Sequence, residues 1–249
     1  MSKRHVTQEQ LRKEKKSSLA MIFGLVVTGI LIFTFTVMRT TNAFTPPAVA
    51  TEIAITPITL KVIHTAQDGL HIGNSNAPVK IDVWEDFQCP ICKYYTDSIE
   101  PLVIKNYIET GKVYYTFHFL PIIEQNSTLP THESHQAANA AMCANEQGHF
   151  WDYHDLLFAN ALGENVGSFT DVRLAAFARG LNLNMNDFNQ CFQAKRYYAQ
   201  IDQDYKAGMA KGAQGTPSIY LNGTLLTPGY LSQYNQISQA IDTALAGSK

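Results

Sequence analysis

Two cysteines separated by two residues are the feature of this 249-residue sequence with the clearest chemical potential. Cys89 and Cys92 enclose a proline and an isoleucine, a spacing shared by thiol–disulfide exchange sites and by half of many zinc sites. A structural zinc site needs two further ligands, usually a second close pair. The remaining cysteines, Cys143 and Cys191, lie far apart, and neither has a close cysteine partner. The pattern therefore favours redox chemistry over structural zinc.

The elements around this pair would activate one of the two cysteines. Residues 79–83 alternate apolar and polar side chains, as a half-buried strand does, and apolar residues recur at helical spacing over 91–108. Pro90 suits the first turn of that helix. A helix N-terminus lowers a thiol's pKa, so we expect Cys89 to form the mixed disulfide with substrate and Cys92 to resolve it.

Further elements follow from the same patterns. Pro101 predicts a kink in the helix and Gly111 its end. Residues 112–120 then predict a second strand, parallel to the first through the crossover helix. The chain is helix-rich over about 131–213, and Asn222-Gly223 is typical of a two-residue hairpin turn between strands 217–221 and 224–226. A last helix is expected over about 232–246, and a short strand over 58–64.

An uncharged run of 20 residues, 19–38, lies near the N-terminus. As a helix it would span roughly 30 Å, the thickness of a bilayer core. It follows a basic tail, residues 1–18, that should stay in the cytoplasm and place the rest of the chain outside. We therefore expect a single-pass signal anchor in the cell membrane, followed by a linker or arm over 39–71. Cleavage as a signal peptide stays an alternative.

Charge is distributed unevenly between the two ends of the chain. Residues 1–39 hold seven basic and two acidic residues, which leaves 12 basic and 19 acidic residues in the rest. An acidic body argues against a nucleic-acid partner, because such binding depends on phosphate neutralisation by Lys and Arg.

The second pair of cysteines fits a structural role. An extracytoplasmic location permits disulfides, and an even cysteine count allows two bridges, of which the second would join Cys143 to Cys191. Two buried free thiols are the alternative.

Three stretches of this sequence resemble the DsbA-like branch of the thioredoxin superfamily. Residues 86–92, DFQCPIC, resemble that branch's active site, and Gly215-Thr216-Pro217-Ser218 resembles its cis-proline loop. Residues 147–155, QGHFWDYHD, are similar to a signature of its helical insert. The resemblance covers residues 72–245. It implies an α/β thioredoxin fold interrupted by a helical subdomain over about 131–213, within which Cys143 and Cys191 fall.

The resemblance also implies a function for the site. Thr216 and a cis Pro217 would lie beside Cys89 and pair with an extended substrate, while Pro90 and Ile91 shape the site; a trans proline that opens an edge strand is the alternative. The expected activity is oxidation of cysteine pairs in exported proteins, without a cofactor, with a membrane thiol oxidase restoring the disulfide. A reductase or isomerase is the alternative, and a chaperone or metal-delivery module is a third hypothesis.

Two departures from the family pattern bear on the redox potential. The buried carboxylate expected six residues before the first cysteine is replaced by Val83. Asp82, Glu85 or Asp86 could substitute for it, although Asp86 is expected to cap the helix or to be a solvated loop acid. Ile91 also takes the place of the histidine that stabilises the thiolate in strongly oxidising relatives.

The histidines do not form a recognisable metal motif in the sequence. We expect those of the insert, His132, His135, His149 and His154, to be surface or packing residues, and no metal site is predicted. A packing or edge role is also expected for His118, although it could approach the cysteines.

Overall fold

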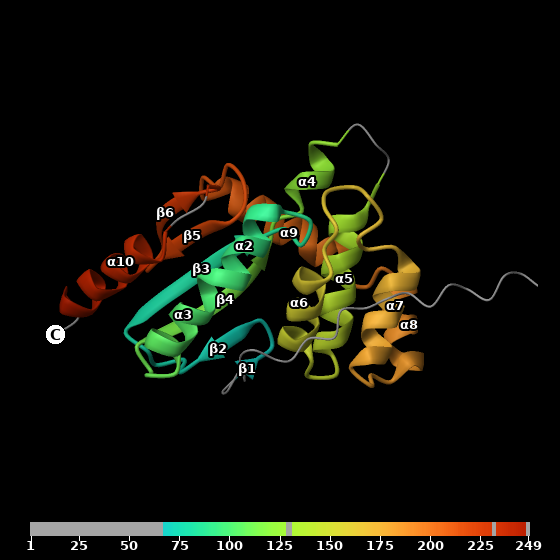
Figure 1. The fold of residues 1–249 in the computed structure, drawn as a ribbon, viewed down its shortest axis with the longest axis horizontal. Helices are drawn as coiled ribbons and strands as arrows, with labels where there is room; N and C mark the ends of the chain where they lie inside the picture. The colour runs from blue at the N-terminus through green and yellow to red at the C-terminus, as the bar shows by residue number, and fades with distance from the viewer. Residues whose placement is uncertain (1–66, 128–130, 231–232, 248–249) are drawn as a thin grey trace, which may run out of the picture. The chain divides into compact units, whose positions relative to one another are not determined.

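A mixed sheet lies at the centre of the fold, with the strand order β1-β2-β4-β3-β5-β6 (Figure 1). The computed structural model describes residues 67–127, 131–230 and 233–247, all of them within one unit, Ile53–Lys249. The strands are β1 (Gln67–Asp68), β2 (His71–Gly73), β3 (Val79–Glu85), β4 (Val113–Phe119), β5 (Ser218–Leu221) and β6 (Thr224–Pro228).

The two central strands, β3 and β4, are parallel, as expected from the sequence. They pair in register from Val79 opposite Val113 to Glu85 opposite Phe119. Val79, Ile81 and Val83 are all buried on one face of β3, because successive side chains of a strand point to opposite sides. The other face of β3 is buried at Trp84, so both sides of the sheet are covered where the strands end.

The helix that follows β3 is divided into three parts. α2 (Pro90–Ser98) ends one residue before α3 (Glu100–Val103), and a π-helical turn, η1 (Ile104–Ile108), continues it. The break at Ile99 precedes Pro101, whose ring cannot continue a regular helix. The expected kink is therefore present. The segment ends at Gly111 in the left-handed region, with φ 72°.

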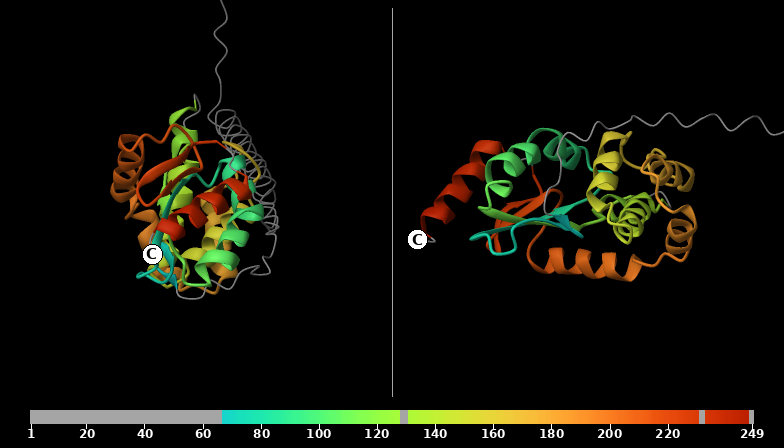
Figure 2. Two further views of the ribbon diagram at one scale, coloured as in Figure 1. Left: turned by 90° about the vertical axis from the view of Figure 1, so that its left-hand side faces the viewer. Right: turned by 90° about the horizontal axis from the view of Figure 1, so that it is seen from below.

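Helices cover both faces of the sheet (Figure 2). The divided helix and the C-terminal helix α10 (Tyr234–Gly247) lie on one face, where α10 contacts α3 and β3, and η1 contacts β4. The opposite face is covered by α9 (Tyr198–Ala210), which contacts β4. This layering is that of a thioredoxin-like α/β fold.

The helical insertion lies between β4 and β5. It begins with the short α4 (Ile122–Gln125) and continues through α5 (Glu133–Asn145), α6 (Phe150–Ala159), α7 (Asp171–Gly180) and α8 (Met185–Gln193) before α9 returns to the sheet. α5 contacts α6, α7, α8 and α9, and its alanines are almost fully buried. Small side chains allow neighbouring helices to approach α5 from several sides, which explains its alanine-rich sequence.

The hairpin predicted at Asn222-Gly223 is present between β5 and β6. Both turn residues have positive φ, 49° and 78°, as a type I′ turn requires. The expected anchor, the strand at 58–64 and the arm as far as residue 66 lie outside the described residues. The last residues expected in the arm, 67–71, instead include β1 and the first residue of β2. Among the helices that the structure describes, none is long and apolar enough to cross a membrane.

Candidate active site

Cys89 and Cys92 are free thiols at the start of α2. Cys89 is the N-cap residue and Pro90 occupies the first turn, both as expected. Cys89 is 5% exposed and Cys92 is fully buried. Of the two cysteines, Cys89 is therefore the more accessible to a partner thiol. Pro90 and Ile91 are exposed beside it.

The Thr216–Pro217 peptide bond is cis and lies next to Cys89. In its protonated form, the Cys89 Sγ donates a hydrogen bond of 3.4 Å to the carbonyl oxygen of Thr216. Two glycines allow this loop to cross the end of β6, because a Cβ on Gly229 would lie 2.4 Å from the Cα of Gly215. The structure thus brings Cys89 next to the Thr216–Pro217 bond, although Cys89 and Thr216 are 127 residues apart in sequence.

The two thiols differ in acidity because their surroundings differ. The pKa of Cys89 is lowered to about 6, mainly by a hydrogen bond from the Cys92 thiol, with Thr216 and the helix N–H groups of Ile91 and Cys92 adding to it against the effect of burial. Burial raises the pKa of Cys92 well above its usual value, and the neighbouring Cys89 and Glu85 add to the rise. At neutral pH the pair therefore holds a thiolate at Cys89 and a thiol at Cys92.

A buried carboxylate is present below the cysteines, displaced by two residues along β3. Glu85 is 1% exposed, and burial together with the charge of Glu100 raises the pKa of Glu85 well above its usual range. Because side chains alternate along a strand, Glu85 lies on the same face as Val83. Of the three acids expected as possible substitutes, Asp82, Glu85 and Asp86, Glu85 is therefore the one on this face beside Cys92. Glu100, 2% exposed, was missed, although it is eight residues after Cys92 and so on the same side of the helix.

Asp86 was expected to cap the active-site helix or to be solvated, and both expectations are wrong. No side chain caps α2, and Asp86 is 3% exposed. Its carboxylate accepts hydrogen bonds from the backbone N–H groups of Gln88 and Ile123 and lies within hydrogen-bond distance of the Ser134 hydroxyl. Burial nevertheless raises the pKa of Asp86 to about 7.

Gln88 connects the insert to the turn before Cys89. Its side-chain amide donates to Ser134 of α5 at 2.8 Å and accepts from the backbone N–H of Asn165 at 2.6 Å. Gln88 is 1% exposed, so these bonds form in a dry environment where they are strong. The sequence held no signal for this connection, since the partners are 46 and 77 residues away.

Several side chains considered from the sequence lie away from the cysteines. His118 stacks on Trp84 and bridges Asp204 and Asp82 on the α9 side of the sheet, in a packing role. In the insert, His154 is buried among aromatic rings and His135 bridges Glu124 and Asp202. Of the aromatics near the motif, Trp84, Phe87 and Tyr95 belong to the core, and Tyr94 is 47% exposed.

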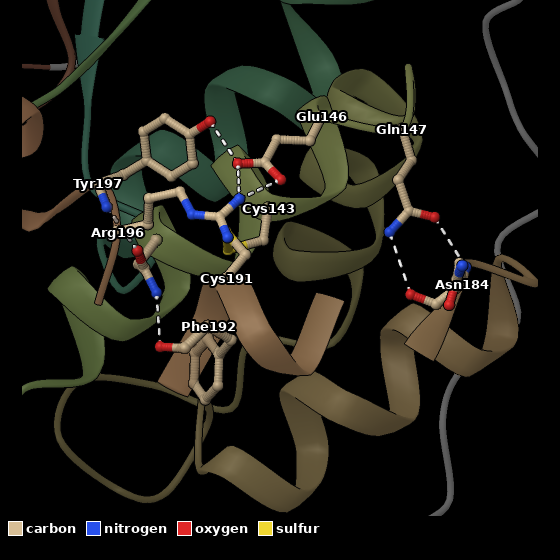
Figure 3. The surroundings of a disulfide bond; sticks show 9 residues. Cys143, Glu146, Gln147, Asn184, Cys191, Phe192, Arg196 and Tyr197 are labelled. Carbon is tan, nitrogen blue, oxygen red and sulfur yellow. Dashed lines mark hydrogen bonds and ion pairs between the residues drawn. A yellow bond between two sulfur atoms is a disulfide. The ribbon is translucent and has the colours of Figure 1, made fainter. Parts of the chain in front are cut away.

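Cys143 and Cys191 form a disulfide between α5 and α8 (Figure 3). Their Cα atoms are 5.8 Å apart, within the range that a disulfide spans. Glu146 lies nearby and accepts from both Arg196 and the hydroxyl of Tyr197. The alternative of two free thiols is therefore not what the structure shows.

Comparison with known proteins agrees with this architecture. A family model described as Thioredoxin matches residues 65–243. The probable disulfide bond formation protein D of Bacillus cereus is 26% identical over 176 residues, which are 70% of this chain and 77% of the relative. The crystal structure of oxidised BdbD from Bacillus subtilis superposes with a TM-score of 0.62 at 23% identity, covering 72% of this chain and 94% of that chain.

A second solved structure, alpha-DsbA1 from Wolbachia pipientis, superposes with a TM-score of 0.61 at 20% identity over 72% of this chain and 92% of that chain. These relatives, the helical insertion between β4 and β5 and the redox motif at the start of α2 all indicate the same family. The chain belongs to the thioredoxin family, and within it to the DsbA-like thiol–disulfide oxidoreductases.

Proposed function

We propose that this protein oxidises cysteine pairs of exported proteins through the Cys89–Cys92 disulfide. The observation that carries the proposal is the lowered pKa of Cys89, about 6, beside a Cys92 whose pKa is raised. A stabilised thiolate stabilises the dithiol form, and a stable dithiol makes the corresponding disulfide a better oxidant. The hydrogen bonds around the Cys89 sulfur therefore support electron flow from substrate to enzyme.

The reaction is a pair of thiolate–disulfide exchanges. A substrate thiolate attacks the Sγ of Cys89, because Cys92 is buried; the Cys89–Cys92 bond breaks and Cys92 leaves with the electron pair and takes up a proton. A second substrate thiolate then attacks the substrate sulfur of the mixed disulfide and releases Cys89 as a thiolate. The substrate loses two electrons and gains a disulfide, and the enzyme pair gains those two electrons.

The location and the partners form part of the same proposal. The uncharged run 19–38 after a basic tail supports a single-pass anchor in the cell membrane, with the catalytic domain outside the cytoplasm. A membrane thiol oxidase would then accept the electrons and restore the disulfide. Labelling of intact cells with a membrane-impermeant maleimide checks the topology: modification of reduced Cys89 supports it, and protection until lysis contradicts it.

The experiment that tests the activity is oxidation of a reduced test protein by catalytic amounts of enzyme, with oxidised glutathione present to restore the Cys89–Cys92 disulfide after each turnover. Cys89→Ser should abolish turnover. Cys92→Ala, mixed with the oxidised test protein, should accumulate a mixed disulfide, because its Cys89 thiolate attacks a substrate disulfide, the displaced substrate thiolate leaves, and no Cys92 is present to resolve the bond. A matched control, Tyr94→Phe, keeps the exposed ring beside the motif and should retain turnover. Turnover that survives Cys89→Ser contradicts the assignment.

A reductase or isomerase remains the second candidate, and Ile91 favours it because no histidine stabilises the thiolate here. The reduction potential, measured by equilibration with glutathione, separates the two candidates. A potential nearer about −120 mV supports oxidation, and a value near about −270 mV supports reduction.

A further inference from the structure

Three buried ionisable side chains meet below the redox helix. One carboxylate oxygen each of Glu85 and Glu100 and a ring nitrogen of His154 all lie within 4.8 Å of one another. The three residues are 1%, 2% and 0% exposed. They come from β3, α3 and α6, so that the sheet, the redox helix and the insert each contribute one. Burial of two carboxylates is costly unless positive charge neutralises them.

The two ring nitrogens of His154 differ in their hydrogen bonding. Its Nδ1 lies 3.0 Å from the carboxylate of Asp155, and the tautomer that donates to this carboxylate carries its lone pair on Nε2. The Nε2 atom is buried and has no hydrogen-bond partner among the described residues. A histidine that binds a metal through one nitrogen characteristically donates its other N–H to a carboxylate, as His154 does.

Glu85 lies beside two hydrogen-bond donors, the Cys92 thiol and the Tyr115 hydroxyl. In the part of the chain that the structure describes, however, neither of its carboxylate oxygens makes a hydrogen bond of normal geometry. The rings of Phe87, Phe117 and Phe158 pack around His154 and exclude water. The cluster thus offers several acceptors, and a divalent cation satisfies them together where a proton satisfies one or two.

We propose that Glu85, Glu100 and His154 bind one divalent transition-metal ion of the Zn²⁺ type. Two carboxylate oxygens and an imidazole nitrogen form a ligand set that Zn²⁺ accepts, with a fourth position left open. Bonds of about 2.0–2.2 Å around a central ion hold ligand atoms no more than ~4 Å apart. Side-chain shifts of under ~1 Å therefore close the site.

The proposed metal site does not depend on whether the protein oxidises or reduces its substrates. A bound ion would nevertheless affect Cys89 and Cys92. Glu85 is a direct neighbour of Cys92, so a bound dication would favour the thiolate forms of both cysteines and make the disulfide more oxidising. Because all three ligands are buried, we expect the ion to enter during folding.

The test uses the double variant Cys89→Ser/Cys92→Ser, because a free dithiol binds zinc by itself. The chain is refolded with Zn²⁺ or Co²⁺, passed over a desalting column and analysed for metal content and for the visible spectrum of tetrahedral Co²⁺. We expect one metal ion per chain, lost on adding Glu85→Gln or His154→Gln. Glu109→Gln and His149→Gln, at exposed or half-exposed positions, are matched controls that retain it.

Two further measurements keep the test decisive if a variant binds weakly. Asp155→Asn leaves the ligands in place and should lower metal affinity by about 10–100-fold. Glu85→Gln should abolish the rise in melting temperature that Zn²⁺ gives the Cys89→Ser/Cys92→Ser protein. The proposal is overturned if the refolded Cys89→Ser/Cys92→Ser protein holds no stoichiometric metal, or if Glu85→Gln retains the metal. Glu85 and Glu100 would then form a protonated carboxyl pair.

Discussion

The hydroxyl of Ser134 lies 2.8 Å and 2.9 Å from the two carboxylate oxygens of Asp86. One contact thus joins the first long helix of the insert to the turn that precedes Cys89. The same hydroxyl accepts the side-chain amide of Gln88. The insert is therefore bound to the redox motif by a buried polar network as well as by apolar packing.

Removing this hydroxyl should destabilise the protein. Ser134→Ala leaves the buried amide of Gln88 without its acceptor, and an unmet buried polar group costs about 1–3 kcal/mol. Urea unfolding of the oxidised protein measures the loss. Ser98→Ala, at an exposed position of α2, is the matched control and should change stability by less than about 0.5 kcal/mol. An equal effect of both substitutions would show that the network contributes nothing.

Asp86 should make the protein less stable as the pH rises. Burial raises its pKa to about 7 in the folded chain, so the folded state binds more protons than the unfolded state between about pH 4 and 7. The contribution of Asp86 is complete below pH 4 and is lost as the pH rises through 7, by up to ~4 kcal/mol. In oxidised protein, the stability difference between wild type and Asp86→Asn should fall over this range. A constant difference contradicts the raised pKa.

The motif and the order of the elements could be predicted from local sequence, and the polar contacts of the site could not. Strand alternation, the proline positions and Asn222-Gly223 act within a few residues, so they predicted β3, the break at Ile99 and the hairpin. The partners of Asp86 and Gln88 in the insert are far away in the sequence, and only tertiary packing brings them together. Asp86 therefore looked like a loop acid, although its environment is buried.

Cys89 should stabilise the reduced protein increasingly as the pH rises. Its folded pKa is about 6, below the value of an unfolded thiol near 8.5. The contribution is complete above the unfolded pKa and is lost as the pH falls through 6, at about 1.4 kcal/mol per pH unit. Urea unfolding of reduced wild type and Cys89→Ser between pH 6 and 8.5 measures this slope. Parallel curves would place the pKa of Cys89 at its ordinary value.

The disulfide of the insert should contribute stability without affecting the redox site. Cys143 and Cys191 are 48 residues apart in sequence, and a bridge that closes a loop of this size stabilises by about 2–4 kcal/mol. The double variant Cys143→Ala/Cys191→Ala should lose that amount in urea unfolding and keep the pKa of Cys89, followed by thiolate absorbance. A changed Cys89 pKa would show that the insert disulfide also positions the redox helix.

His118 should contribute most to folding stability at acidic pH. Burial lowers its pKa, but hydrogen bonds to Asp204 and Asp82 outweigh that effect and raise it overall. A raised histidine pKa gives stability that is complete below the unfolded pKa of about 6.5 and is lost as the pH rises through the folded value. His118→Gln should therefore cost about 1–2 kcal/mol more at pH 5.5 than at pH 9. His118 lies on the α9 side of the sheet, stacked on Trp84, so the same substitution should leave the reactivity of Cys89 unchanged. Slower alkylation of Cys89 in this variant would instead couple the two faces of the sheet.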